Sequence, residues 1–323
     1  MSPDPAPFLW LWTGAAAAWW AVAWGLSRPR APRTTTHPAD AMRPPVAAFR
    51  AVPRLRGSLP EDVAASLRAL AAQLRPGDQL LVAHRPEDGA LLGPLFAEVA
   101  EIAPCPALFL PRADADRWAN PKVDAYAQLA PHARHPLWFW SDADIRLPAD
   151  GLAALLGAWT GRRPGTGFVT CLYRIPSVPD ARALPEALFV NAEFFPGARL
   201  LARGERLRCA FGAGILFAPP EGESRAAFWE RIGPCLADDH ALGRLLGPGL
   251  GAPFEAETAA GETTWRGAVA HYYRWHKTIR WCAPIGFAGQ IVLHPSLGWI
   301  GWLLLGGGVH ALHGLGATLL LEA

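Results

Sequence analysis

Charge of either sign is scarce in this chain of 323 residues, in which Asp, Glu, Lys and Arg together make up 18%. The formal net charge of +2 is too small for a surface that neutralises many phosphates, so we exclude nucleic acid as a partner. Paired cysteines are lacking as well: no Cys-x-x-Cys occurs, and neither zinc nor disulfides are implied. We expect reduced core thiols in a domain that faces the cytosol. The cysteines are Cys105, Cys171, Cys209, Cys235 and Cys282.

Formal charge is absent from residues 8–27, near the N-terminus. As a helix this stretch would span about 30 Å at roughly 1.5 Å per residue, which matches the hydrocarbon core of a bilayer. Arginines follow from Arg28 onward, and the positive-inside rule places the residues after them in the cytoplasm. We therefore predict an N-terminal transmembrane anchor over residues 1–27. A cleaved signal peptide ending near Ala23 is the alternative, although the usual basic segment before the apolar run is lacking.

A second uncharged stretch covers residues 281–321. Its length allows two short membrane spans, or one span together with a re-entrant or interfacial segment. Pro295 and the Gly306-Gly307-Gly308 triplet are natural break points. We predict C-terminal membrane segments over residues 283–323 and leave their number open.

Short apolar runs alternate with helical patterns between these ends. Residues 28–50, rich in Pro, Arg and Thr, are predicted to be a linker. Ser58-Leu59-Pro60-Glu61 has the form of a capping box that opens a helix ending near Leu74. The alternation indicates an α/β fold with an open, mostly parallel sheet flanked by helices, whose ligands bind beyond the carboxyl ends of the strands. Buried strands are predicted at residues 79–83, 107–110, 137–140 and 167–173, and a further helix at residues 151–159.

The strand at residues 137–140 ends in Ser141-Asp142-Ala143-Asp144. Mg²⁺ and Mn²⁺ prefer oxygen ligands, usually one or two carboxylates together with phosphate oxygens. We therefore predict that Asp144, with Asp142 nearby, holds a divalent cation that binds a diphosphate. The alternative is that both are turn residues that end the strand.

Three further motifs accompany the Asp-x-Asp. Asn120-Pro121-Lys122-Val123 precedes it, and Ala237-Asp238-Asp239 and residues 277–281 follow it. In this order the motifs resemble the ceramide glucosyltransferase family and its bacterial relatives, including the glycosyltransferases associated with hopanoid biosynthesis. The resemblance covers roughly residues 51–286 and implies a cytosolic GT-A-like domain, which we place at residues 51–266.

The resemblance implies an inverting transfer, in which a lipid hydroxyl attacks the anomeric carbon of a sugar as a nucleoside diphosphate leaves. The family position of the general base falls on Asp239, and such a base is typically worth about 10²- to 10⁴-fold in rate. Lys277 and Arg280 are expected to bind the leaving diphosphate, and Lys122 and Trp281 are also assigned to substrate binding. UDP-glucose or UDP-N-acetylglucosamine is the expected nucleotide-sugar donor. Ceramide, a hopanoid or diacylglycerol is the expected lipid acceptor.

Plainer roles stay open for several of these residues. Asp238 and Asp239 could simply lie at the N-terminus of a helix over residues 240–246, where the helix dipole favours acids. Lys122 could be an ordinary surface lysine. Gly212-Ala213-Gly214 either lines the acceptor site or forms a bend in a strand.

The chain departs from the family pattern at two positions. The first family aspartate, which helps to hold the nucleotide base, corresponds here to Arg85. We expect Asp88 or Glu87 to take its place, and we assign Asp88 to substrate binding. Lys277 stands where the family has Gln or Arg.

Residues 267–282 are predicted to form an amphipathic helix. Basic and aromatic side chains on such a helix are typical of segments that lie on a membrane surface. In the family that the chain resembles, this segment also closes over the active site. A purely interfacial helix is the alternative.

These features together predict a glycosyltransferase of the bacterial inner membrane, anchored at both ends, with its catalytic domain facing the cytoplasm. Its expected partners are a nucleotide-sugar donor, a lipid acceptor and the membrane. A processive polysaccharide synthase shares the aspartate motifs and is one alternative. A non-catalytic, membrane-bound protein that binds nucleotide sugars is the other, and Arg85 is the residue that favours it.

Overall fold

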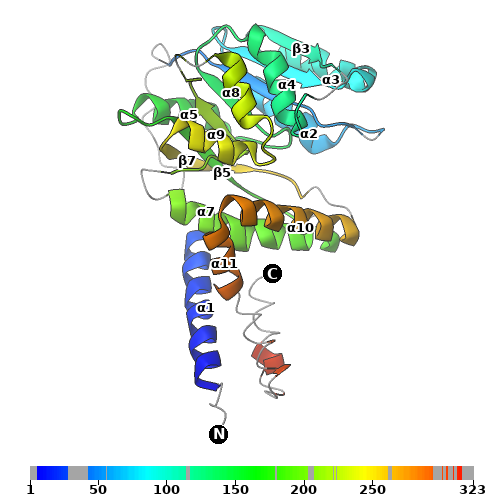
Figure 1. Cartoon of the computed structure of the whole chain (residues 1–323). Helices are drawn as coiled ribbons and strands as arrows, with labels where there is room; N and C mark the ends of the chain where they lie inside the picture. The colour runs from blue at the N-terminus through cyan, green and yellow to red at the C-terminus, as the bar shows by residue number, and fades with distance from the viewer. Residues whose placement is uncertain are drawn as a thin grey trace. The chain divides into compact units, whose positions relative to one another are not determined.

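In the computed structural model, the chain forms two compact units (Figure 1). The sheet unit comprises Arg30–Pro176 and Leu201–Ala259, and the helical unit comprises Met1–Pro29, Ser177–Leu200 and Ala260–Ala323. The structure describes residues 6–27, 43–55, 57–113, 117–178, 180–202, 207–220, 222, 224–260, 264–293, 300, 303–304, 308 and 311–314.

One sheet of seven strands has the order β3-β2-β1-β4-β6-β5-β7. β6 runs antiparallel to β4 and β5, whereas the other neighbouring strands pair in parallel. The predicted α/β class with a mostly parallel sheet is therefore confirmed. The strands are β1 (Ala47–Ala51), β2 (Gln79–His84), β3 (Ala107–Pro111), β4 (Trp138–Ser141), β5 (Phe168–Arg174), β6 (Ile215–Phe217) and β7 (Gly249–Glu257).

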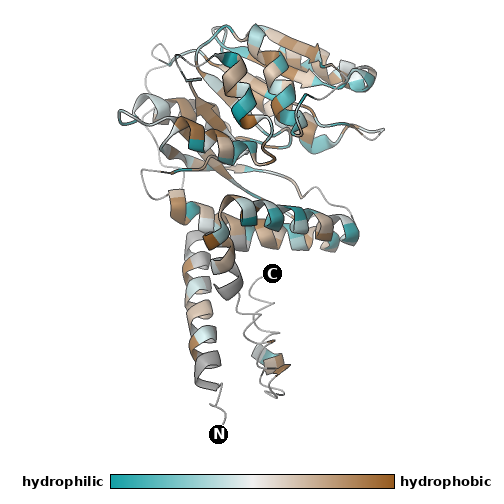
Figure 2. Cartoon of the chain, viewed as in Figure 1, coloured by the Kyte–Doolittle hydropathy of each residue, from teal (hydrophilic) through white to brown (hydrophobic). Residues whose placement is uncertain are grey.

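Helices cover both faces of this sheet because its central strands are apolar on both sides (Figure 2). On one face, Ala48 and Phe139 belong to a core that also contains aliphatic side chains of α2, α3 and α5. On the other face, alternate residues of the same strands are aromatic, and Trp140 stacks on Trp229 of α8 with ring centroids 5.6 Å apart. The helices of this unit include α2 (Glu61–Ala71), α3 (Gly89–Ile102), α4 (Pro121–Leu129), α5 (Gly151–Thr160), α8 (Arg225–Ile232) and α9 (Asp238–Leu246).

Two local predictions differ from the structure. β1 begins at Ala47, inside the segment predicted as a linker, so the sheet starts before Ala51; residues 28–42 lie outside the described residues. The capping box is also wrong. Pro60 occupies the N-cap position of α2, and its side chain has no polar atom that could form a cap hydrogen bond. Ser58 lies two residues before this position, so it is not the N-cap.

The helical unit is built from long and short helices around aromatic contacts. α10 packs on a π-helical segment, Phe189–Phe194, where Phe189 stacks on Trp275 with ring centroids 4.8 Å apart. His271 Nδ1 lies 3.2 Å from Glu186 Oε1. The helices of this unit include α1 (Ala6–Ser27), α6 (Leu184–Leu188), α7 (Phe195–Ala202, its last residues in the sheet unit), α10 (Trp265–Cys282) and α11 (Pro284–Leu293).

The predicted transmembrane segments fall on α1 and on the residues after α10. No helix in the described part of the chain combines the length and apolar character needed to cross a membrane. α1 is uncharged, but its Ala, Gly, Thr and Trp residues make it less apolar than a run of Leu, Ile and Val. Residues 294–299 and 315–323, with most of 301–310, lie outside the described residues.

Candidate active site

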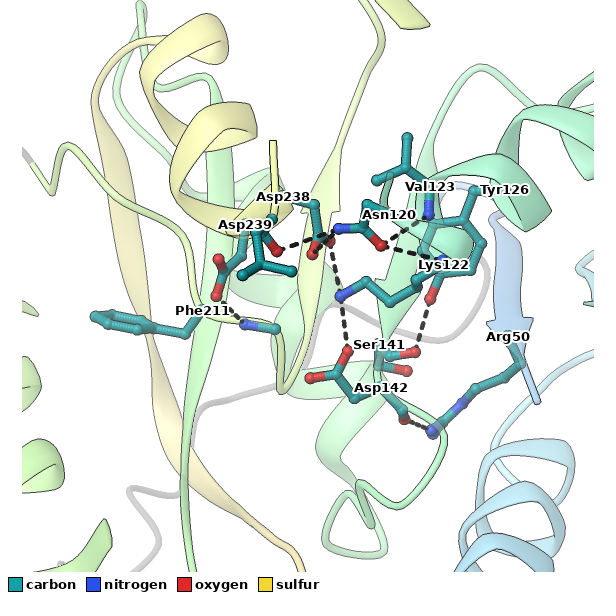
Figure 3. A network of polar contacts seen from close by, with 12 residues as sticks. Arg50, Asn120, Lys122, Val123, Tyr126, Ser141, Asp142, Phe211, Asp238 and Asp239 are labelled. Carbon is teal, nitrogen blue, oxygen red and sulfur yellow. Dashed lines mark hydrogen bonds and ion pairs between the residues drawn. The ribbon is translucent and has the colours of Figure 1, made fainter. Parts of the chain in front are cut away.

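The predicted site residues of the sheet unit gather at the carboxyl end of β4. β4 ends at Ser141, and the Asp-x-Asp loop follows it directly. The N-terminus of α4, the N-terminus of α9 and the loop at residues 210–214 all contact this region (Figure 3). Open α/β sheets bind their ligands at such an edge, beyond the carboxyl ends of the strands.

Side chains from three different elements hold the backbone of the Asp-x-Asp loop in place. They occupy its carbonyl oxygens, so the loop conformation does not depend on a bound ligand. Tyr126 Oη donates to Ser141 O at 2.8 Å, and Ser66 Oγ donates to Ala143 O. Arg50 donates to Asp142 O and, at 2.9 Å, to Ile145 O.

Arg50 is the charged residue among these donors, and only 1% of its surface is exposed in β1. Burial lowers the pKa of its guanidinium, and the fixed fork of N–H donors suits the pair of carbonyls that it bridges. Sequence reasoning missed Arg50, because the linker assignment covered it. A charged residue between Phe49 and Ala51 is the signal that could have found it, since a buried charge requires several partners.

The two carboxylates of the Asp-x-Asp have different partners. Asp142 Oδ1 accepts a hydrogen bond from Lys122 Nζ at 2.7 Å, and the Asp142 side chain is 40% exposed. Asp144 Oδ2 accepts from Thr258 Oγ1, also at 2.7 Å. Burial, and then the charge of Asp142, raises the pKa of Asp144. A bound cation would offset the repulsion between these two carboxylates.

The end of β7 fixes the far side of the loop. Arg146 and Glu257 exchange two backbone hydrogen bonds, at 2.8 and 2.9 Å, and their side chains form an ion pair at 2.6 Å. Thr258 follows directly and reaches Asp144. Sequence reasoning missed Thr258, because it lies 114 positions from Asp144 and belongs to no local motif.

Asp239 lies in the first turn of α9, facing the loop at residues 210–214. Its Oδ2 accepts from Gly212 N at 3.0 Å, and its Oδ1 accepts from the backbone N of His240 at 2.7 Å. Burial, followed by the neighbouring charge of Asp238, raises the pKa of Asp239 to about 6. A carboxyl group with such a pKa is ionised at neutral pH yet basic enough to accept a proton.

The remaining predicted residues belong to other elements of the chain. Asp88 lies just after β2, is 6% exposed, and accepts a hydrogen bond from Leu55 N at 3.1 Å. Its assignment to substrate binding stays a prediction. Lys277, Arg280 and Trp281 are exposed on α10 of the helical unit, so their assignment to the donor also stays a prediction.

The sequence profile of glycosyl transferase family 21 matches residues 10–322, which is nearly the whole chain. The chain belongs to this family. The match confirms the likeness to ceramide glucosyltransferases that the motifs indicated, and it makes the protein a glycosyltransferase. No curated protein matches it in sequence.

Two solved structures are similar to this chain. The mannosyltransferase PcManGT from Pyrobaculum calidifontis, in complex with GDP-Man and Mn²⁺, is 15% identical with a TM-score of 0.50. The match covers 97% of this chain and 94% of that one. Mannosyl-3-phosphoglycerate synthase from Rubrobacter xylanophilus is 17% identical over 75% of each chain, with a TM-score of 0.40. The GT-A-like architecture of the glycosyltransferase is thus supported by the first of these likenesses.

Asp142 and Asp144 are the carboxylates of this glycosyltransferase whose chemistry fits a divalent cation. Within the described ranges, no cluster of three or more His, Cys, Asp or Glu side chains is positioned to hold a metal ion. Asp142 and Asp144 offer two carboxylate groups, which is the number that Mg²⁺ commonly takes from a protein when phosphates complete its ligands. These two carboxylates therefore fit a cation that also binds the oxygens of a diphosphate.

Gly212 allows the Asp-x-Asp loop and the N-terminus of α9 to approach each other closely. Its carbonyl accepts from Asp142 N at 3.0 Å, and its N–H donates to Asp239. A Cβ atom at this position would lie 2.5 Å from Asp142 Oδ2. We expect Gly212→Ala to displace the Asp142 carboxylate and to lower the transfer rate about tenfold, because a misplacement of about 1 Å at a reacting site can cost up to about 10²-fold in rate. Steady-state kinetics check this, with Gly93→Ala, which meets no atom within 4 Å, as the control. Equal rates in the two variants would contradict it.

Proposed function

We propose that this glycosyltransferase moves a hexose or N-acetylhexosamine from a UDP-sugar to a lipid hydroxyl, with inversion at the anomeric carbon. The observation that carries the proposal is the position of Asp239. Its carboxylate, with a pKa of about 6, lies in the same polar network as the Asp-x-Asp at the ligand-binding edge of the sheet. A general base beside a diphosphate site is what transfer to a hydroxyl requires.

The reaction follows from these residues in one displacement. The acceptor oxygen attacks the anomeric carbon while Asp239 accepts the hydroxyl proton. The bond between the anomeric carbon and the diphosphate oxygen breaks on the opposite face, which inverts the configuration. Arg280 and Lys277 are proposed to bind the diphosphate as negative charge develops on it.

A divalent cation, Mg²⁺ or Mn²⁺, is proposed as the cofactor, with Asp144 and Asp142 as its protein ligands. When bound, it would supply positive charge to the leaving diphosphate. Thr258 orients the Asp144 carboxylate, and Lys122 holds the Asp142 carboxylate near α9.

The exposed face of α10 supports a lipid acceptor and attachment to the inner membrane, with the catalytic domain on the cytoplasmic side. α10 carries no Asp or Glu, and its sequence places cations beside aromatic residues. Hydrophilic and hydrophobic residues follow one another along this helix (Figure 2). Trp281 is 81% exposed and Tyr273 is 68% exposed. Such a basic, aromatic helix suits the headgroup region of an anionic bilayer. The exposed residues of this face are Trp265, Arg266, Val269, Tyr273, Arg274, Lys277, Arg280 and Trp281.

This membrane contact predicts a charge-dependent affinity for vesicles. We expect Arg266→Gln combined with Arg274→Gln to weaken binding to phosphatidylserine vesicles about tenfold or more, since each surface cation contributes about 1 kcal/mol. Co-sedimentation at low and high salt measures it, with phosphatidylcholine vesicles as the uncharged reference. Arg231→Gln on α8 of the sheet unit is the control variant. Equal binding of both variants to anionic vesicles would contradict the assignment of this face.

Turnover in membranes that contain the protein tests the proposed function directly. UDP-glucose and UDP-N-acetylglucosamine are supplied separately with Mg²⁺ or Mn²⁺, and the lipid extract is analysed by mass spectrometry. A new lipid with one hexose or N-acetylhexosamine supports the proposal and names both substrates. A long polymer would instead identify a processive synthase. Nucleotide binding without any product would overturn transfer to a lipid.

A further inference from the structure

The ammonium group of Lys122 lies between carboxylates from two different elements. Lys122 Nζ is 2.7 Å from Asp142 Oδ1 and 2.7 Å from Asp238 Oδ2, and its side chain is 23% exposed (Figure 3). Although burial opposes its charge, Asp142 and Asp238 raise the pKa of Lys122 well above the ordinary value. Lysine occurs only at positions 122 and 277 of this arginine-rich sequence. A compact ammonium suits the narrow space between two carboxylates better than a planar guanidinium does.

Asn120 determines where Lys122 lies. It is the N-cap of α4, and its side-chain oxygen accepts hydrogen bonds from the backbone N–H groups of Lys122 and Val123. Asn120 is 5% exposed. The first turn of α4, and with it the base of the Lys122 side chain, is therefore fixed by one amide oxygen.

The amide nitrogen of the same side chain reaches the opposite element. Asn120 Nδ2 lies within hydrogen-bond distance of three oxygens that lead into α9: Cys235 O at 3.1 Å, Leu236 O at 3.2 Å and Asp238 Oδ1 at 3.1 Å. One side chain thus ties the N-termini of two helices together. The residue that follows Asp238 is the general base of the proposed function.

The choice of asparagine is informative. Ser, Asp and Asn cap helices about equally well, so capping alone does not require an amide. Only Asn among them combines an acceptor for the cap with an NH₂ group that donates two hydrogen bonds. Without these donors, Asp238 would keep only the ion pair with Lys122, and the carbonyls of Cys235 and Leu236 would lose their hydrogen bonds to the N-cap of α4.

We propose that Asn120 is a positioning residue for the transfer reaction, which holds Asp239 in place by tying the 235–238 segment to the N-terminus of α4. This rests on the proposed function of Asp239. Asn120 acts through Asp238 and the backbone and touches neither substrate. Lys122 completes the connection by pairing Asp238 with Asp142, so that the general base and the Asp-x-Asp keep a fixed separation.

Asn120→Ser separates the two roles of the side chain, because it keeps a capping oxygen and removes the amide donors. We expect kcat to fall about tenfold to hundredfold with the donor KM within about twofold, since a displacement of about 1 Å at a reacting group costs up to 10²-fold. Gln79→Ser is the matched control. Gln79 is also a buried amide that bridges two backbone groups, His132 O at 2.9 Å and Arg134 N at 3.0 Å, at the opposite edge of the sheet.

Hydrogen exchange gives a readout that does not require activity. Asn120→Ser should raise exchange of the backbone amides at residues 235–242, and Gln79→Ser should leave them unchanged. Should Asn120→Ser not fold, Asn120→Asp, which keeps the cap and the side-chain volume, carries the same test.

Three results would overturn this role. The first is an unchanged kcat together with an unchanged donor KM. The second is a raised donor KM at constant kcat, which would mean that Asn120 contacts the donor directly. The third is unchanged exchange at residues 235–242. If the unaltered protein makes no glycolipid, the proposed function fails, whereas the exchange experiment still decides whether Asn120 holds this segment.

Discussion

Asp239→Asn is expected to lower the transfer rate about 10²- to 10⁴-fold, the usual contribution of a general base. Asparagine has the same shape, and its single side-chain oxygen can still accept from the backbone N–H of Gly212, although its NH₂ group cannot replace the oxygen that accepts from His240 N. It cannot accept the proton of the acceptor hydroxyl. The loss should therefore fall on kcat, while the affinity for the UDP-sugar, measured by calorimetry, stays within a few-fold of the original.

An exposed aspartate provides the control for this substitution. Asp150 lies before α5 and makes no side-chain cap hydrogen bond, so Asp150→Asn changes the same chemical group without removing a contact of the site. Turnover by Asp239→Asn at the level of Asp150→Asn would exclude Asp239 as the base.

The acidity of Asp239 adds a pH dependence to the transfer rate, and Asp239→Asn should remove it. The base must be ionised to accept a proton, and the pKa of Asp239 is about 6, raised by burial and by Asp238. The rate should therefore increase as pH rises through about 6 and level off above it. A profile that is flat between pH 5 and 7 would contradict this assignment.

The sheet was predictable because its strands are marked by local pattern. Residues 79–83, 107–110 and 167–173 are apolar runs of strand length, and the structure forms β2, β3 and β5 over them. β1 was not predicted, because Arg50 interrupts its apolar run and because Pro and Arg residues precede it. Its strand conformation depends on pairing with β2 and β4, which lie far along the chain.

The site was predictable only as far as its motifs are contiguous. Asp142, Asp144 and Asp239 could be named from short motifs, and the sheet unit brings Asp142 and Asp239 together around Gly212. The long-range contacts of the site could not be predicted in this way. Thr258 belongs to no motif, and although Asn120 stands in a short motif, nothing local shows that it contacts Asp238. Both contacts depend on tertiary packing across more than one hundred residues of sequence.

Asp144→Ala should give the second large effect, on donor binding. Asp144 is the proposed cation ligand, and Thr258 orients its carboxylate. Losing a residue that only orients a metal ligand typically costs about tenfold to hundredfold in affinity. Removing the ligand itself should weaken Mn²⁺-dependent binding of the UDP-sugar by more than this. Binding measured in the presence of a chelator should change little, since only the cation-dependent part of the affinity depends on this carboxylate.

Thr258→Val separates orientation from ligation. Valine keeps the shape of threonine and removes the hydroxyl that donates to Asp144 Oδ2. The carboxylate itself remains, so we expect a smaller loss of Mn²⁺-dependent affinity than in Asp144→Ala, with the same direction. A Mn²⁺ titration of donor binding, followed by calorimetry, ranks the two variants. If Asp144→Ala gives the titration of the unaltered protein, the Asp-x-Asp ends a strand and Asp144 does not bind the cation. If Thr258→Val costs as much as Asp144→Ala, the hydroxyl is itself a ligand, because loss of orientation alone leaves a carboxylate that can still reach the cation.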